Sequence, residues 1–313
     1  MKRRKSLLRI VLIILALSGL FFSVAHGNLP EEISSCYDPF IGGLIQRLSQ
    51  DGFDLEFLSK LFLDPRAELM PELMTMSLVS RETTDLYAPF LSSESILLAK
   101  RFLQKNISIL QEAEKRFHVD KEVIVAILLV ESRFGENIGR RRVFPTLASI
   151  AVMDLPENLQ YNYQVLLGIH SELAYDMVEE LAKRRAQWAY QELKHFLQII
   201  RNEGMDPLEV KGSYAGALGM PQFLPSSYRN YSLNSKSFEE WLTSKEGAII
   251  SIANYLKSNG WKRDLSLQKK RQVIWSYNHS TPYVDTILQI AQKIKPEASR
   301  SSQPKSGNPP AQK

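Results

Sequence analysis

The chain has 313 residues and a formal net charge of +5. Five of its 39 Lys and Arg residues lie within residues 1–27, which contain no acidic residue, and the remaining 34 equal the Asp and Glu residues in number. The basic excess therefore belongs to the N-terminus and gives no reason to expect nucleic acid as a partner. The single cysteine, Cys36, excludes an internal disulfide and is best read as a small core residue.

The N-terminus has the organisation of a secretory signal peptide. Five of residues 2–9 are basic, residues 10–22 are apolar, and Ala25 and Gly27 are small residues at the two key cleavage positions. We expect cleavage after Gly27 and export. The alternative is an uncleaved membrane anchor, although the apolar run is short for a span, which needs about 20 residues.

Residues 28–85 are expected to form an N-terminal helical segment that packs on the domain that follows it. Apolar residues recur at helical spacing between residues 39 and 62, with a break at Asp51-Gly52. Prolines then divide this part of the chain into short helices.

Two helices are predicted next. Residues 92–117 place apolar side chains along one broad face, which predicts a single amphipathic helix. Asp120 is a candidate N-cap for the following helix, which runs to about Phe134 and is apolar on nearly every side. A helix of that kind is usually central to a core.

The second half of the chain is also predicted to be helical. Long helices are expected within residues 158–200, a Gly/Pro/Ser-rich loop region within 204–227, and further helices at 245–259, 269–277 and 282–294, although 272–277 also fit an extended segment. Residues 296–313 have the composition of a disordered tail. Strand signals are scarce, so the predicted fold class is mainly α.

One acidic residue stands out within the central helix. Glu131 ends an almost unbroken apolar run, IVAILLVESRFG, at residues 124–135. Because an ionised carboxylate is costly beside so much hydrocarbon, we expect a raised pKa and a protonated acid near neutral pH. Cleavage of a glycosidic bond needs such a proton donor. The alternative is a glutamate that points at solvent or pairs with Arg133 or Arg140.

Other chemistries have little support in the sequence. The five histidines are scattered and form no metal-binding spacing, so no metal and no cofactor are expected. The segment GSYAGALG at 212–219 lacks the ending of a nucleotide-binding loop and suggests a tight turn at Gly216 and Gly219. No nucleophile elbow of a serine hydrolase is present.

The remaining polar and aromatic residues fit a saccharide. Sugars present apolar ring faces and many hydroxyl groups, so a groove with aromatic rings and amide or hydroxyl donors matches both. Each aromatic residue taken alone could equally fill the core. The set comprises Ser213, Tyr214, Gln222, Phe223, Tyr228, Tyr255, Trp261, Tyr277, Asn278 and Tyr283.

Four motifs, in this order, resemble the lytic murein transglycosylases of the membrane-bound B type: VAILLVESRFG, KGSYAGALGMPQFLPSSY, SIANYLKSNGW and WSYNHSTPYV. The resemblance extends from about Asp38 to Ile294 and implies a lysozyme-like catalytic domain with an additional N-terminal or inserted helical lobe. The domain limits that follow are 1–27 for the signal peptide, 28–85 for the N-terminal segment, 86–295 for the catalytic domain and 296–313 for the tail.

The resemblance also implies roles for individual residues. Glu131 matches the single catalytic acid/base of the family. Arg184 and Arg185 resemble an arginine pair that faces the peptide stem, although a solvated helix face is the plainer interpretation. The residues expected to bind substrate are Ser213, Gln222, Phe223, Tyr255, Tyr277, Asn278, Tyr283, Arg184 and Arg185.

Two departures from the family are visible. No carboxylate occurs between Tyr228 and Glu239, where some members carry a calcium loop, so we expect no calcium site there. The segment of residues 154–181, between the helix of Glu131 and the arginine pair, is longer than the resemblance leads us to expect. It could form an extra helical hairpin beside the substrate.

The implied activity is cleavage of the β-1,4 bond between N-acetylmuramic acid and N-acetylglucosamine in peptidoglycan, with a 1,6-anhydromuramoyl product, by a monomer in the periplasm. The partner is the glycan strand; contacts with cell-wall synthesis or secretion machinery stay open. One alternative is a hydrolytic muramidase that pairs Glu131 with Glu136. Another is a catalytically silent peptidoglycan-binding protein.

Overall fold

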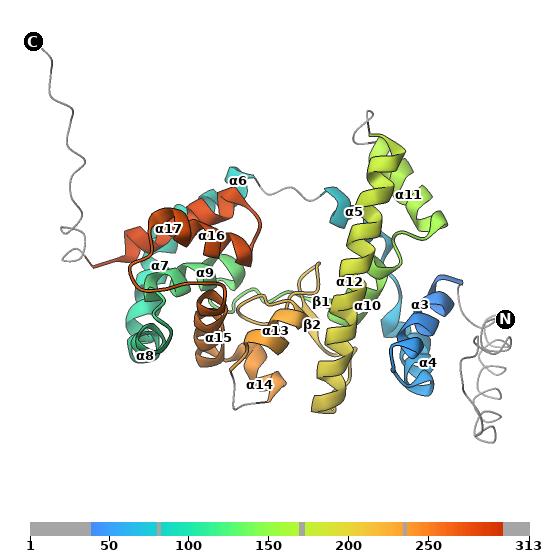
Figure 1. Cartoon of the computed structure of the whole chain (residues 1–313), viewed down its shortest axis with the longest axis horizontal. Helices are drawn as coiled ribbons and strands as arrows, with labels where there is room; N and C mark the ends of the chain where they lie inside the picture. The colour runs from blue at the N-terminus through green and yellow to red at the C-terminus, as the bar shows by residue number, and fades with distance from the viewer. Residues whose placement is uncertain (1–38, 80–82, 169–172, 234–236, 297–313) are drawn as a thin grey trace, which may run out of the picture. The chain divides into compact units, whose positions relative to one another are not determined.

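The computed structural model of the chain describes residues 39–79, 83–168, 173–233 and 237–296, and these are mainly helical (Figure 1). The predicted fold class, mainly α, is confirmed. Within these ranges no helix combines the length and the apolar character that crossing a bilayer requires. The predicted signal peptide, Cys36 and nearly all of the predicted tail lie outside the described residues.

The chain divides into two compact units, residues 1–55 and 56–313. The described part of the first unit is α3 (Pro39–Gln50) and the turn after it. Gly52 makes that turn with a φ of 87°, a left-handed conformation that glycine adopts without steric cost. The break predicted at Asp51-Gly52 is therefore confirmed. The domain boundary predicted at residue 85 remains a prediction.

The second unit consists of short and long helices with one small sheet. Its helices begin with α4, whose first residue still belongs to the first unit. In chain order they are α4 (Leu55–Leu63), η2 (Pro65–Ala67), α5 (Pro71–Val79), α6 (Thr84–Tyr87), η3 (Ala88–Leu91), α7 (Ser93–Lys105), α8 (Ile107–Phe117), α9 (Lys121–Ser132), α10 (Val143–Ala151), α11 (Pro156–Leu167), α12 (Tyr175–Glu203), α13 (Pro225–Tyr231), α14 (Phe238–Thr243), α15 (Lys245–Ser258), α16 (Leu267–Tyr277) and α17 (Thr281–Ile294).

Helix α9 is the centre of one group of helices. It contacts α7, α8, α15 and α17, and Figure 1 shows these helices gathered around it. The side chains of residues 123–129 are at most 2% exposed. Burying one aliphatic side chain of this size stabilises a fold by about 1.5–3 kcal/mol, so this helix contributes strongly to the core. The central position predicted for it is confirmed.

Helices α5, α10, α11 and α12 form a second group. The nine-residue α10 packs against part of the 29-residue α12, and α5 contacts α10, α11 and α12. A buried hydrogen bond of 2.6 Å from the Thr75 hydroxyl to the Asn162 amide oxygen joins α5 to α11. Residues 154–181 contribute α11 and the start of α12, so the described part of this segment is largely helical, as expected.

A two-stranded antiparallel sheet connects distant parts of the chain. Strand β1 (Arg141–Arg142) follows α9, and strand β2 (Lys211–Gly212) follows α12. Their register pairs Arg141 with Gly212 and Arg142 with Lys211. The sequence did not predict this sheet, because two-residue strands leave no alternating pattern.

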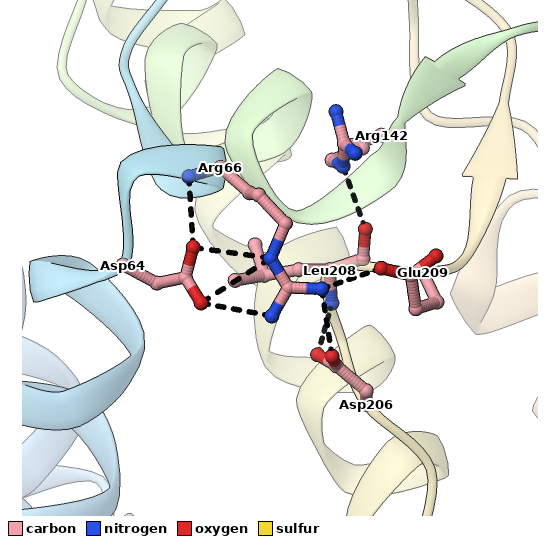
Figure 2. A network of polar contacts seen from close by, with 6 residues as sticks. All are labelled: Asp64, Arg66, Arg142, Asp206, Leu208 and Glu209. Carbon is pink, nitrogen blue, oxygen red and sulfur yellow. Dashed lines mark hydrogen bonds and ion pairs between the residues drawn. The ribbon is translucent and has the colours of Figure 1, made fainter.

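A network of charged residues ties η2 to the end of α12 (Figure 2). The Asp64 carboxylate accepts hydrogen bonds from the Arg66 backbone N–H (2.9 Å) and guanidinium, and Arg66 also pairs with Asp206 (2.9 Å) and Glu209. The hydrogen bonds from Arg66 lower the pKa of Asp64 to about 2. Arg142 donates to the neighbouring backbone carbonyl of residue 208 at 2.8 Å.

Two sequence predictions need correction. The helix predicted over residues 92–117 is two helices, α7 and α8, because Asn106 leaves the helical conformation (φ −116°, ψ 23°) and its side-chain amide donates to the Phe102 carbonyl. Asp120 precedes α9 as predicted but makes no side-chain cap bond. Its carboxylate instead pairs with Lys270 at 2.6 Å.

Candidate active site

Glu131 lies in the last turn of α9 and is half-buried. The helix ends immediately after it, because Arg133 and Phe134 both adopt left-handed backbone conformations (φ 49° and 61°). The Phe134 ring stacks on Phe102 at 4.1 Å, which holds this strained end in place. The buried part of α9 thus presents one carboxyl group at its C-terminal end.

A tyrosine hydroxyl contacts this carboxyl group. The Tyr283 hydroxyl donates a hydrogen bond of 2.6 Å to Oε1 of Glu131. Tyr283 is 1% exposed and lies in the first turn of α17, where its backbone N–H is capped by the Ser280 hydroxyl. The contact therefore joins two residues 152 positions apart through α9 and α17, the helices that pack most closely around the site.

Three further predicted site residues gather beside Tyr283. The Tyr277 ring is parallel to the Tyr283 ring at 6.4 Å and contacts Tyr255 edge-on at 4.9 Å. Phe223 lies 5.7 Å from Tyr255 and 5.8 Å from Tyr277, between ring centroids. We call Phe223, Tyr255, Tyr277 and Tyr283 the aromatic cluster.

Backbone carbonyl groups accept hydrogen bonds from two of the hydroxyl groups of the cluster. Tyr277 donates to the Pro221 carbonyl at 2.5 Å, and Tyr255 donates to the Ser276 carbonyl. Burial, and then the negative charge of Glu131, raise the pKa of Tyr283 and of Tyr277 well above the usual value of 10. Burial also raises the pKa of Tyr255. These phenols therefore keep their protons near neutral pH and act as neutral donors.

A tight loop between β2 and α13 holds Ser213. Its hydroxyl oxygen accepts hydrogen bonds from the backbone N–H groups of Ala215 (3.1 Å) and Ala217 (3.0 Å). Gly216 has a φ of 79°, and a Cβ there would lie 2.7 Å from the Leu147 side chain. The close approach predicted at this glycine is confirmed, and the two backbone N–H groups fix the direction of the Ser213 side chain.

Gln222 joins this loop to the chain that follows α9. Its side-chain amide donates to the carbonyls of Gly219 (2.8 Å) and Ile138 (3.2 Å), and its backbone is left-handed with a φ of 49°. Met220 also packs at this junction. Its side chain lies so near Gly135 that a Cβ added to the glycine would be only 3.2 Å from it. Gln222 is therefore held against the segment that begins four residues after Glu131.

The structure places the other predicted residues as follows. Asn278 is half-buried at the C-cap of α16, directly after Tyr277. Phe223 is only 2% exposed, so its ring packs against the tyrosines and has little surface that a substrate could contact. Arg184 and Arg185 are exposed on α12; Arg184 lies 3.6 Å from Glu180, and Arg185 lies over the Trp188 ring. Within the described ranges, neither arginine is brought together with the aromatic cluster by a hydrogen bond, ion pair or ring contact.

Three residues of the site were missed by the sequence analysis. Tyr87 contacts the Tyr283 ring edge-on at 5.9 Å, and Met220 and the Pro221 carbonyl support Gly135 and Tyr277. A carbonyl oxygen has no signature in a sequence. Met220 and Pro221 were part of a quoted motif, and Tyr87 stands outside every motif.

The described residues contain no group of three or more His, Cys, Asp or Glu side chains that could hold a metal ion. Part of the segment where a calcium loop was considered, residues 234–236, lies outside the described ranges. The described side chains at Glu131 offer one carboxyl group beside protonated phenols. Such a pair can transfer a proton to and from a substrate oxygen.

Comparison with known proteins gives the family. The family model described as the transglycosylase SLT domain matches residues 37–273, which is more than half of the chain. The membrane-bound lytic murein transglycosylase B of Escherichia coli K12 is 33% identical over 173 residues, or 55% of this chain. That match spans only 40% of the relative's length.

Solved structures share the fold. Slt35, a lytic transglycosylase of Escherichia coli solved with bulgecin A, has a TM-score of 0.66 at 22% identity, over 85% of this chain and 95% of that one. SltB3 of Pseudomonas aeruginosa, solved with NAG-anhNAM-pentapeptide, has a TM-score of 0.63 at 18% identity, over 82% of this chain and 78% of that one. The lysozyme-like fold implied by the resemblance is confirmed, and the chain belongs to the transglycosylase SLT domain family.

Proposed function

We propose that this protein is a lytic transglycosylase that cleaves the β-1,4 bond between N-acetylmuramic acid and N-acetylglucosamine in peptidoglycan. Glu131 is its single acid/base, and the product carries a 1,6-anhydromuramoyl end. The observation that carries the proposal is the hydrogen bond of 2.6 Å from Tyr283 to Glu131, at the C-terminal end of a buried helix. Family membership supports the same substrate class.

In the first step, protonated Glu131 gives its proton to the oxygen of the leaving sugar as positive charge develops on the muramoyl ring. The Tyr283 hydroxyl stabilises the carboxylate formed by the transfer, because it keeps its own proton and donates to Oε1.

In the second step, the Glu131 carboxylate accepts the proton of the muramoyl C6 hydroxyl, whose oxygen attacks C1 and closes the anhydro ring. The nucleophile belongs to the substrate, so no second catalytic carboxylate is needed. Attack within one molecule can lower the barrier by up to roughly 7–11 kcal/mol relative to attack by a separate molecule.

The substrate contacts follow from the donors and acceptors of the site. The Ser213 oxygen already accepts two backbone N–H groups, so its hydroxyl hydrogen serves as a donor to the sugar. The Gln222 amide nitrogen is bound to two carbonyls, so its oxygen serves as an acceptor. Tyr255, Tyr277 and Asn278 border the sugar ring, while Phe223 supports the tyrosines.

Contacts beyond the sugar are part of the same proposal. The exposed arginine pair, Arg184 and Arg185, faces the carboxylates of the peptide stem. Signal-like residues 1–27 direct a monomer to the periplasm, where peptidoglycan is found. There, the glycan strand is its principal partner.

Digestion of purified sacculi tests the catalytic assignment. The Glu131→Gln variant should lose at least about 1,000-fold in rate, because the amide can neither give nor accept the proton. Glu136→Gln is the matched control: Glu136 is exposed and pairs with Arg133 at 2.9 Å, so its loss should change the rate less than about twofold. Equal rates for Glu131→Gln and the parent would overturn the proposal.

The products separate the two alternatives. A transglycosylase releases muropeptides that are one water lighter than those of a hydrolase and lack a reducing end. A silent binding protein would sediment with sacculi and release nothing. Reducing-end products that depend on both Glu131 and Glu136 would favour the hydrolytic muramidase.

A further inference from the structure

A pocket lies on α16 and α17, and its lining includes neither Glu131 nor any residue of the aromatic cluster. It has a volume of about 320 Å³, within the range of small-ligand pockets. The lining residues are Gln268, Arg271, Gln272, Trp275, Thr281 and Val284. The function proposed above makes no use of this pocket.

The spacing along α16 explains how the pocket forms. Gln268, Gln272 and Trp275 are four and then three residues apart, so they share one face of the helix. Trp275 and Tyr277 are two residues apart and project from nearly opposite sides. The helix therefore presents Tyr277 to the aromatic cluster and Trp275 to a separate surface.

The pocket has an apolar floor and wall with a polar rim. Val284 on α17 is 2% exposed and forms part of its base, whereas the Trp275 ring is 40% exposed. His279 contacts the Trp275 ring at 79° and 5.7 Å, which restrains it. The pocket therefore offers an accessible aromatic face to a ligand.

The polar groups fit a neutral ligand rich in hydroxyl and amide groups. Arg271 forms an ion pair with Asp285, which compensates its charge and ties α16 to α17. Two glutamine amides and the Thr281 hydroxyl supply both donors and acceptors around the indole. An aromatic face surrounded by amides and hydroxyls matches the apolar face and hydroxyl rim of a pyranose ring.

We propose that this pocket binds a second segment of a β-1,4-linked N-acetylhexosamine strand, the polymer class that the proposed function assigns to the enzyme. Binding one polymer at two places raises its apparent affinity, because the second contact forms at a high effective concentration. The pocket thus anchors the enzyme on the strand while Glu131 acts elsewhere on it.

Binding to insoluble murein tests the proposal. All variants are made in full-length Glu131→Gln protein, so the polymer stays intact, and are co-sedimented with sacculi and with glycan strands stripped of peptide stems. Trp275→Ala should weaken binding to both polymers by about tenfold or more. Trp275→Tyr should restore binding to within about threefold, because a phenol can still stack on a sugar.

One further variant is a control, and another is a second test of the pocket. Leu267→Ala removes an exposed apolar side chain (64% exposed) from the same helix outside the pocket and should bind like the parent. Gln272→Ala removes a rim amide with little risk to folding and should weaken binding in the same direction as Trp275→Ala.

Two results would overturn the proposal. The first is that both Trp275→Ala and Gln272→Ala bind stripped strands as tightly as the parent. The other is a loss confined to stem-bearing sacculi, which would identify a peptide as the occupant. Failure of the proposed function is a separate result, since it would appear as unchanged murein after incubation with the protein that retains Glu131.

Discussion

At the scale of single residues, the catalytic centre that we propose is the pair of Glu131 and Tyr283. A carboxyl group at the end of a buried helix accepts a hydrogen bond from a phenol that keeps its proton. The apolar run that marked Glu131 in the sequence is the buried body of α9. Tyr283 was named from a motif, and the structure gives it a specific partner.

Removing the Tyr283 hydroxyl should slow turnover without abolishing it. A hydrogen bond to a charged group contributes about 1.5–3 kcal/mol, so Tyr283→Phe should lower kcat by about 10- to 150-fold. The ring and its contacts with Tyr277 and Tyr87 are retained. The control is Tyr161→Phe on α11, whose side chain is 53% exposed and should leave kcat unchanged. A kcat for Tyr283→Phe equal to that of the parent would contradict the assigned contact.

At the scale of elements, the site depends on a close crossing between the loop after α9 and the loop after β2. Gly139 has a φ of 89°, and a Cβ there would lie 2.0 Å from the Gly212 backbone and 2.5 Å from the Ser213 nitrogen. Only glycine fits at this crossing. The β1–β2 pairing and the bond from Gln222 to Ile138 both depend on it.

Gly139→Ala should therefore destabilise the fold and the site together. Gly52→Ala is the matched control, because Gly52 has a similar φ of 87° but has open space where the alanine methyl group would lie. We expect Gly52→Ala to cost about 1–2 kcal/mol from backbone strain alone. Gly139→Ala should cost at least about 2 kcal/mol more, since the added clash is with backbone. Similar denaturation midpoints for the two variants would contradict the crossing.

Local patterns predicted most of the helices but not the contacts between them. The amphipathic pattern of residues 92–117 was correct, yet it hid the break at Asn106, because the apolar face continues across α7 and α8. Glu131 was predicted from the apolar run before it, and Tyr277 and Tyr283 from the polar and aromatic set and the motifs. Their partners, such as the Pro221 carbonyl, depend on backbone positions far along the chain that no local pattern encodes.

At the scale of the whole molecule, a network of charged residues joins segments that are distant in the sequence. Asp64 and Arg66 follow α4, whereas Asp206 and Glu209 follow α12, well over 100 positions later (Figure 2). Charged residues are common on every surface, so the sequence contained no sign that these four would meet. The network joins the start of the second unit to the end of its longest helix.

Because of this network, the free energy of unfolding should decrease at acidic pH. The folded protein holds the pKa of Asp64 at about 2, below the ordinary 3.8, so the ion pair is fully present above about pH 4. Its contribution is lost as the pH falls from about 4 to 2. Since the residues are largely accessible to solvent, which screens the ion pair, we expect this contribution to be small.

Chemical denaturation across pH tests this expectation. Asp64→Asn should be less stable than the parent at pH 7, and the difference should shrink as the pH approaches 2. Glu112→Gln, an exposed position on α8, is the control and should follow the parent at every pH. A stability difference for Asp64→Asn that is constant between pH 7 and pH 2 would exclude the ion pair as its cause.

The central claim is that the substrate's own C6 hydroxyl, activated by Glu131, replaces water as the nucleophile. Digestion of sacculi in water enriched in ¹⁸O, followed by mass spectrometry of the released muropeptides, tests it directly. The account predicts anhydro ends with no ¹⁸O at the newly formed muramoyl terminus. Muramoyl ends that carry one ¹⁸O atom would show that water attacks, and would contradict it.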